Sequence, residues 1–456
     1  MIKKNVGILL PVSALPSKHG IGDFSFYAYQ FIDWLHAHHY YYWQILPLNP
    51  IGPGHSPYMT VCSEAIDIRY ISLDALVKEG LLDKVPLFRP NAQTIEYEKV
   101  LAFKEKYLRK AFKNSDYSLN AFKKKNPWVK EYAKYLILKK INNNKCWNEW
   151  EINDIPKTCD DELNFHIWCQ FIAYKQRNQI LKYAHQKNIQ IIADCPFYVG
   201  LDSVDCYLHQ DEFLFDENKR PTVVSGCPPD AFSDEGQLWG TPIYDFDKMA
   251  ENNYSFLINR IAFLAEHSDY LRLDHFRAFD TYCVIPSSDD NAKRGEWKIG
   301  PRTAFFDILF KQYPHIKIIA EDLGELFPSV HELRDYYHLP GMRVIQFCLF
   351  EDLPDNDNII LYPGTHDNQT LYGFLKSLDE EHLKILRDYF HHPKDLYGAL
   401  FDYVWEMPSL LTIFPLADLL KLDDKARINH PGTVGKPNWC FKLKDMTWVD
   451  KIKYGQ

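Results

Sequence analysis

Eight short apolar runs recur along the chain, and they restrict its possible folds more than any other feature. Each is rich in β-branched or aromatic residues, and most are followed by sequence with helical periodicity. The runs cover residues 6–11, 41–48, 189–199, 270–276, 316–324, 342–350, 359–367 and 410–420. Strands that alternate with helices predict a parallel sheet with crossover helices. Eight such units are typical of an α/β protein of the (β/α)8 TIM-barrel class.

Two of the connections are too long for simple strand–helix units. Residues 74–188 contain helical stretches such as VKEYAKYLILKKI, whereas residues 200–250 are rich in Pro, Gly and Asp. We expect a helical insertion after the second strand and a long functional loop after the third. Both would belong to a single barrel domain spanning residues 1–456. An open doubly wound sheet is the alternative, but no Gly-x-Gly-x-x-Gly pattern opens the first helix.

Charge and cysteine content narrow the possible partners and the compartment. The 52 Lys and Arg against 61 Asp and Glu give a net charge of -9, whereas a nucleic-acid binder usually shows a basic excess. No stretch of 18 apolar residues occurs in the sequence, so no transmembrane helix is expected. The 10 cysteines are scattered without a Cys-x-x-Cys pair, which favours reduced thiols in a cytoplasmic protein. We expect neither nucleic acid nor membrane as a partner.

Ionisable residues gather at one end of the apolar runs. In a TIM barrel the reacting groups lie at the carboxyl ends of the strands. A single aspartate at a strand end is more often a turn or capping residue. Ionisable residues at the same end of several strands, however, favour a functional site. The residues concerned are Asp194, Arg272, Asp274, Glu321, His366 and Asp367.

Converging carboxylates suit the cleavage of glycosides with retention of configuration. That chemistry needs one carboxylate as nucleophile and a second as acid and then base. A metal site at Asp274–His275 and His366–Asp367 is the competing reading, although no His-x-His or His-Glu-x-x-His pattern supports it. A serine hydrolase is disfavoured because no Gly-x-Ser-x-Gly elbow is present. We expect no metal and no cofactor.

Aromatic residues in two loops could complete a sugar site. Tyr58 lies in GPGHSPYMT after the second strand, and Gln237 and Trp239 lie in GQLWGTP, in the long loop after the third. Aromatic rings can stack on the apolar face of a sugar, while amide groups bind its hydroxyls. The alternative is that Tyr58 and Trp239 only pack their loops.

The motifs as a set resemble the amylomaltases, the 4-α-glucanotransferases (disproportionating enzymes) of the α-amylase-related barrels. The resemblance runs nearly end to end. It rests on GILLPVSALPSKHGIGDF, SPYMTVCSEAIDI, ADCPFYVGLDSVDCY, GCPPDAFSDEGQLWGTPIYDF, LRLDHFRAF, IAEDLGE, GMRVIQF, PGTHDNQT and RINHPGTVGKPNW, in the family's order. It implies a (β/α)8 barrel that transfers α-1,4-glucan segments between malto-oligosaccharides.

The resemblance also implies a role for each site residue. Asp274 matches the nucleophile that forms a covalent glucosyl enzyme, Glu321 the general acid/base, and Asp367 the carboxylate that stabilises the transition state. Arg272 would keep Asp274 ionised. The remaining residues would contact the glucan, with the loop at 200–250 as a substrate loop: His366, Asp194, Tyr58, Gln237 and Trp239.

Three positions depart from the usual family pattern, namely Ala278, Gln369 and Ala417. None is a catalytic carboxylate. Two alternatives to the transferase stay open at this point. One is a plain α-glucan hydrolase, and the other is a catalytically silent glucan-binding barrel, against which the three carboxylates argue.

Overall fold

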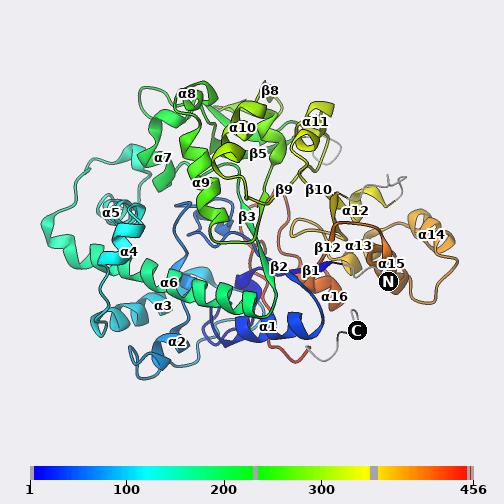
Figure 1. Ribbon diagram of the computed structural model, residues 1–456, viewed down its shortest axis with the longest axis horizontal. Helices are drawn as coiled ribbons and strands as arrows, with labels where there is room; N and C mark the ends of the chain where they lie inside the picture. The colour runs from blue at the N-terminus through cyan, green and yellow to red at the C-terminus, as the bar shows by residue number, and fades with distance from the viewer. Residues whose placement is uncertain (1–4, 230–234, 350–357, 449–451, 453–456) are drawn as a thin grey trace.

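A parallel eight-stranded sheet forms the centre of the computed structural model, which describes residues 5–229, 235–349, 358–448 and 452 (Figure 1). Its strand order is β10-β11-β12-β1-β2-β3-β6-β9. The strands are β1 (Val6–Leu9), β2 (Tyr42–Gln44), β3 (Gln190–Cys195), β6 (Tyr270–Leu273), β9 (Ile318–Ala320), β10 (Gly341–Val344), β11 (Ile359–Tyr362) and β12 (Leu411–Pro415). Each of the eight apolar runs supplies one strand.

The two edge strands, β9 and β10, approach each other and nearly close the sheet into a barrel. The backbone amide of Ala320 donates a 2.9 Å hydrogen bond to the carbonyl of Pro340. The amide of Met342 donates to Oδ1 of Asp322 at 2.7 Å. Apolar side chains of the strands fill the inside: Leu9, Ile192, Ile319, Met342, Val344, Ile360, Tyr362, Leu411 and Ile413. The predicted (β/α)8 barrel is confirmed.

Two of the apolar runs turn into short helices before they end. After β10 the chain forms α12 (Ile345–Cys348), and after β12 it forms α16 (Leu416–Leu419); residue 350 lies outside the described residues. A buried helical turn is as apolar as a buried strand, so the sequence pattern cannot separate them.

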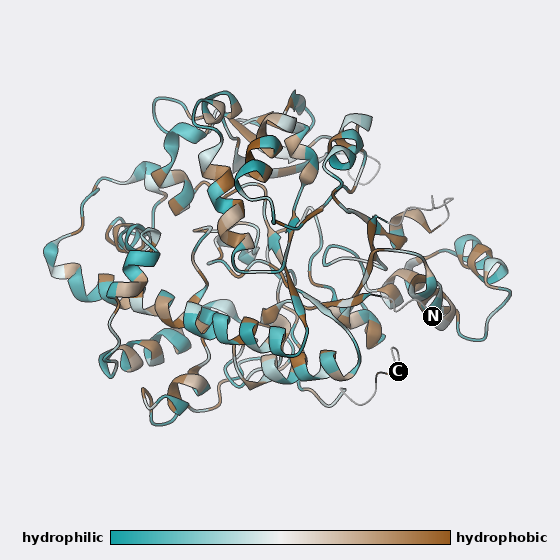
Figure 2. Cartoon of the chain, viewed as in Figure 1, coloured by the Kyte–Doolittle hydropathy of each residue, from teal (hydrophilic) through white to brown (hydrophobic). Residues whose placement is uncertain are grey.

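Residues 74–188 are mainly helical, as their periodicity predicts. They hold most of α2 (Leu73–Lys78), then α3 (Tyr97–Lys113), α4 (Asn120–Lys125), α5 (Trp128–Ile141) and α6 (Asp160–Gln186). The long helix α6 leads back to β3, and the other helices lie on the same side of the barrel (Figure 1). In α3 the buried residues recur at helical spacing, for example Val100, Lys104, Leu108 and Ala111. Hydrophobic and hydrophilic colours alternate along the helices of this segment (Figure 2).

The segment 200–250 differs from the expected irregular loop. Its described residues include α7 (Val204–Leu208), α8 (Phe246–Glu251) and two strands, β4 (Val223–Cys227) and β5 (Gln237–Pro242). These pair antiparallel with β7 (Thr281–Pro286) and β8 (Glu296–Ile299) in the order β5-β4-β7-β8. The sequence could not reveal this pairing, because β7 and β8 come after β6 along the chain whereas β4 and β5 come before it. Residues 230–234 of this segment are outside the described residues.

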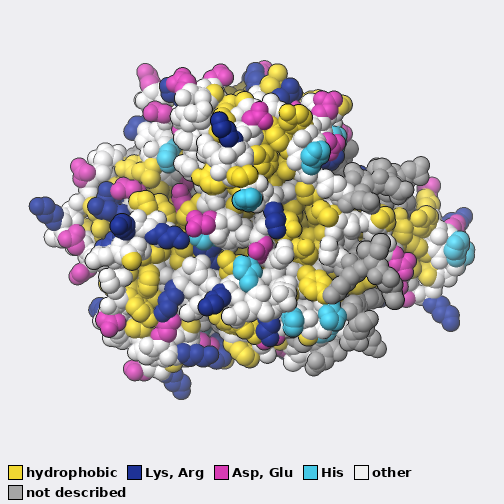
Figure 3. Space-filling model, in the orientation of Figure 1, with side chains coloured by type: hydrophobic (Ala, Val, Ile, Leu, Met, Phe, Trp, Pro, Cys, Tyr) yellow, Lys and Arg dark blue, Asp and Glu magenta, His cyan; other side chains and the backbone are white. Residues whose placement is uncertain are grey.

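The remaining helices cover the barrel and its second sheet. They are α1 (Phe26–Ala37), α9 (Ser255–Ala265), α10 (Arg302–Gln312), α11 (Pro328–Tyr336), α13 (Leu371–Ser377), α14 (Glu380–Tyr389) and α15 (Leu396–Glu406). On the face that Figure 3 shows, acidic and basic side chains are interspersed. Within the described residues, no helix is long and apolar enough to cross a membrane.

Strand β6 illustrates how the barrel orients its polar residues. Leu271 and Leu273 are buried in the apolar layer that also contains Phe305 and Leu309 of α10. Because side chains alternate along a strand, Arg272 faces the other way, and its Nε lies 3.4 Å from Sδ of Met342 in the barrel interior.

Candidate active site

Arg272 links two carboxylates at the carboxyl ends of β3 and β6. Its Nη1 lies 2.7 Å from Oδ1 of Asp194 and 2.9 Å from Oδ1 of Asp274. The Asp194 side chain is fully buried, whereas 27% of the Asp274 side chain is exposed. Asp274 is therefore the carboxylate of the pair that a ligand can reach, and Asp194 anchors the arginine.

Glu321 follows β9 and is held beside Asp274 by the backbone. Its Oε2 accepts a 2.6 Å hydrogen bond from the amide of His275, and its Oε1 accepts one from the amide of Leu323 at 3.3 Å. The carbonyl of Glu321 accepts from the amide of Phe276 at 3.0 Å. The ends of β6 and β9 thus fix the two carboxylates relative to each other.

These two carboxyl groups have pKa values that are raised by different amounts. Burial raises the pKa of Asp274 to about 6, against the opposing charge of Arg272. Burial, again opposed by Arg272, raises the pKa of Glu321 to about 8, and the negative charge of Asp274 adds to the rise. At neutral pH the first group is mainly ionised and the second mainly protonated. Such a pair can supply a nucleophile and an acid together.

The third carboxylate, Asp367, follows β11 and is held in the ionised form. Its Oδ2 lies 3.3 Å from Nε2 of His366, and its Oδ1 accepts a 2.7 Å hydrogen bond from Asn429. Arg427 donates to the backbone carbonyl of Asp367 at 2.7 Å. Burial opposes ionisation, but the charge of His366 and these side-chain hydrogen bonds lower the pKa of Asp367 to about 2.

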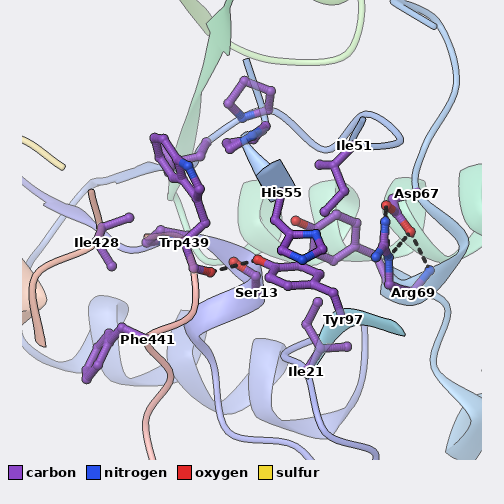
Figure 4. A pocket seen from close by; sticks show the side chains of 15 residues that line it. Ser13, Ile21, Ile51, His55, Asp67, Arg69, Tyr97, Ile428, Trp439 and Phe441 are labelled. Carbon is purple, nitrogen blue, oxygen red and sulfur yellow. Dashed lines mark hydrogen bonds and ion pairs between the residues drawn. The ribbon is translucent and has the colours of Figure 1, made fainter. Parts of the chain in front are cut away.

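Tyr58 joins the Asp194 side of the site to the Asp367 side. Its hydroxyl donates a 2.7 Å hydrogen bond to Oδ2 of Asp194. Its ring stacks on His366, with centroids 5.3 Å apart and planes 16° apart, and lies 5.8 Å from the ring of Trp439. Trp439 also lines a neighbouring cavity of about 20 Å³ with His55 and Tyr97 (Figure 4).

Trp239 and Gln237 border the site from β5 of the second sheet. The indole Nε1 of Trp239 donates a 3.2 Å hydrogen bond to Oε1 of Gln237. The Trp239 ring meets His275 edge to face, with centroids 4.8 Å apart. The second sheet therefore carries both predicted loop residues to the Asp274–Glu321 side of the site.

Sequence reasoning missed several residues that position the carboxylates of the site. Asn429 and Arg427 hold Asp367, and the His275 amide holds Glu321. Asn429 and Trp439 lie within the RINHPGTVGKPNW motif, so this motif could have pointed to them as site residues. Gln369, one of the departures from the family pattern, donates to Asp424 at 2.8 Å. Among the described residues, no group of three or more His, Cys, Asp or Glu side chains could hold a metal ion.

Comparison with known proteins gives concordant results. Residues 10–447 match the sequence model of a family described as 4-alpha-glucanotransferase. The chain is 33% identical to a 4-alpha-glucanotransferase of Streptococcus pneumoniae, over 100% of this chain and 96% of the relative. It is 35% identical to one of Clostridium butyricum, over 97% of this chain and 96% of the relative.

A solved structure matches along the whole length as well. The amylomaltase of Streptococcus agalactiae in complex with acarbose is 30% identical and superposes with a TM-score of 0.94, covering 99% of each chain. The amylomaltase of Corynebacterium glutamicum, at 19% identity and a TM-score of 0.78, shares the fold over 99% of this chain and 74% of its own.

Proposed function

We propose residue roles for the reaction of the 4-alpha-glucanotransferase family, to which this chain belongs. The protein transfers α-1,4-glucan segments by the retaining chemistry of that family. In our proposal Asp274 is the nucleophile, Glu321 the general acid/base and Asp367 the carboxylate that stabilises the transition state. The observation that carries these roles is the geometry at one end of the barrel, where Arg272 Nη1 lies 2.9 Å from Oδ1 of Asp274 and the amide of the next residue, His275, holds Glu321. The raised pKa of Glu321 supports the role of acid.

In the first step, an ionised Asp274 oxygen attacks the anomeric carbon of the donor glucan. The bond to the leaving 4-oxygen breaks, and Glu321 gives that oxygen its proton. The product is a glucosyl ester on Asp274 and a shortened glucan with a free 4-hydroxyl. Arg272, 2.9 Å from Asp274, stabilises the carboxylate before attack.

In the second step, the ionised Glu321 takes the proton of an acceptor sugar's 4-hydroxyl. The acceptor oxygen attacks the anomeric carbon, the ester bond to Asp274 breaks, and both carboxyl groups return to their starting states. Two inversions leave the α-configuration unchanged.

Asp367 and His366 are placed to bind the hydroxyls of the reacting sugar. Asp367 stays ionised because its pKa is lowered to about 2, and 41% of its side chain is exposed to receive a ligand. Asp367 supplies the hydrogen-bond acceptors, while His366 pairs with it beside the stacked Tyr58 ring and keeps it ionised. We assign Tyr58, Gln237 and Trp239 to glucan binding, with malto-oligosaccharides as the substrates.

A single incubation tests this function. Purified protein with maltotriose should yield glucose together with glucans longer than the substrate, resolved by chain length. Glucose and maltose alone would show hydrolysis, and unchanged maltotriose would show a binding protein. The matched variant Asp290→Asn, in the exposed turn between β7 and β8, should give the wild-type products.

We further propose that the chain acts as one catalytic domain. One hydrophobic cluster joins β1, the inserted helices α3 and α6, and the late helix α15, for example through Ile8, Leu108, Trp168 and Phe401. This continuity supports treating segment 74–188 as a subdomain of the barrel. Segment 200–250 shares a second hydrophobic cluster with β6, for example through Tyr244 and Leu271, which supports the same treatment. The ten cysteines are free thiols, which supports a reducing compartment; we propose the cytoplasm.

A further inference from the structure

A second cavity lies outside the active site, on the outer side of the barrel at β2 and β3. It has a volume of about 80 Å³. Its walls come from the end of β2 and the chain after it, from β3, and from helices α6 and α9. Most of the wall is apolar, for example Trp43, Leu48, Ile191 and Phe263. Because one water needs roughly 10–15 Å³ of such space, the cavity can hold several waters or a small organic molecule.

Arg177 of α6 is the cation in this wall, and its charge is not neutralised by a contact. Its Nε and Nη2 are buried without a hydrogen-bond partner among the described residues. Its Cζ lies 4.8 Å from the ring centroid of Tyr174, which offers only a cation–π contact. Glu266 attracts it at longer range, but the carboxylate of Glu266 is paired with Lys125 at 3.4 Å. Two buried guanidinium nitrogens without an acceptor are costly.

Among the described residues of the cavity wall, no other titratable group serves as the anionic partner of Arg177. Nδ1 of His267 donates to the carbonyl of Phe263, 2.6 Å away, and burial together with the charge of Arg177 lowers the pKa of His267 to about 4, so it is neutral. The carboxyl of Glu64 accepts from Sγ of Cys62 at 3.4 Å, and Glu64 is not among the groups whose charge acts on Arg177. Asp194 is already bound by Arg272 and Tyr58.

The cavity adjoins a hollow on the surface. Leu181 of α6 belongs both to its wall and to a hollow bordered by Asn178, Lys182 and His185. Lys182 is exposed there, so the approach carries a positive charge that would attract an anion.

We propose that this cavity is a binding site for a small organic carboxylate with an apolar body, whose carboxylate pairs with Arg177. Planar, two-pronged pairing of guanidinium with carboxylate is the strongest interaction that this side chain offers, and the apolar wall buries the hydrocarbon part. Ala193 and Asp194 of β3 line the cavity. A bound molecule therefore lies against the strand that anchors Arg272.

Calorimetric titration of the full chain with hexanoate, hexanol and inorganic phosphate tests the proposal. We expect one hexanoate per chain, with affinity at least tenfold above that of hexanol and no phosphate binding. Arg177→Gln should lose hexanoate binding at least tenfold, and Leu181→Trp, which puts a larger side chain into the cavity wall, should lose it too. Arg387→Gln, an exposed arginine on α14, is the matched control and should bind as the wild type.

Three outcomes would overturn the proposal. They are equal affinity for hexanoate and hexanol, hexanoate binding that survives Arg177→Gln, and phosphate binding that Arg177→Gln abolishes, which would mark a site for inorganic anions. Circular dichroism of Arg177→Gln confirms that the variant is folded. The activity of Arg177→Gln on maltotriose without hexanoate should match that of the wild type. The test of the carboxylate site is therefore independent of the roles proposed for the transferase residues.

Discussion

The backbone amide of His275 donates a 2.6 Å hydrogen bond to Oε2 of Glu321. Because His275 directly follows Asp274, this bond ties the proposed acid/base to the residue after the proposed nucleophile. His275 adopts a left-handed backbone conformation, with φ 51° and ψ 48°, which a non-glycine residue seldom adopts. The bend at the end of β6 thus holds the proposed nucleophile and the proposed acid/base in their relative positions.

Replacement of the nucleophile should abolish transfer and leave binding intact. In Asp274→Asn the side chain keeps its size but cannot form the glucosyl ester, so kcat for maltotriose should fall about 10⁴-fold or more. Calorimetry should still detect maltotriose binding. Turnover within tenfold of the wild type would refute the assignment, and Asp290→Asn is the control.

The pH profile of kcat/KM should be bell-shaped between the two raised pKa values. The working state has Asp274 ionised and Glu321 protonated. Activity should therefore rise with pH through about 6 and fall through about 8. Initial rates with maltotriose from pH 4 to 10 measure it. A rate that keeps rising above pH 9 would contradict the protonated state of Glu321.

Glu321→Gln should discriminate between leaving groups. A sugar leaving group needs a proton, so the rate with maltotriose should fall about 10²- to 10⁴-fold. Fluoride leaves without one, so the first burst of fluoride from α-glucosyl fluoride should stay close to the wild-type burst. An equal loss with both donors would remove Glu321 from the acid role.

Asn429→Ala should reduce kcat more than it changes KM. The change removes the 2.7 Å hydrogen bond that orients Oδ1 of Asp367, and a small misplacement of such a group can cost about 100-fold in rate. Steady-state kinetics with maltotriose separate the two parameters, and the exposed Asn218→Ala is the control. If KM rises with kcat unchanged, Asn429 acts in binding and not in positioning.

Lys104→Met should destabilise the fold. Lys104 of α3 is completely buried, and its Nζ lies 2.6 Å from Oδ2 of Asp23 while also donating to the carbonyls of Arg69 and Ile71. Loss of the cation leaves Asp23 buried and unpaired, which costs about 3–5 kcal/mol.

Urea denaturation measures that loss as a change in the free energy of unfolding. Lys106→Met, on the exposed side of the same helix, should change it by only about 0.5 kcal/mol. Similar losses in both variants would mean that the buried pair is not the cause.

The strand ends could be predicted from the sequence because each apolar run gives way to ionisable residues within a few positions. In β6, Leu271 and Leu273 alternate with Arg272 before Asp274, and this alternation alone separates the helix-facing side chains from those facing the barrel. The second sheet could not be predicted in this way. Its strands β4 and β7 belong together only through pairing between residues such as Val224 and Ile285, which no local period records.

The sequence by itself determined the eight strands, the helical insertion and the presence of Asp274, Glu321 and Asp367 at strand ends, because periodicity and residue type are local properties. Tertiary structure decided which partners these groups meet. Arg272 between Asp194 and Asp274, the His275 amide on Glu321 and Asn429 on Asp367 join residues from different strands and loops. Their burial and mutual charges set the protonation states on which the chemistry depends, and those quantities exist only once the barrel has closed.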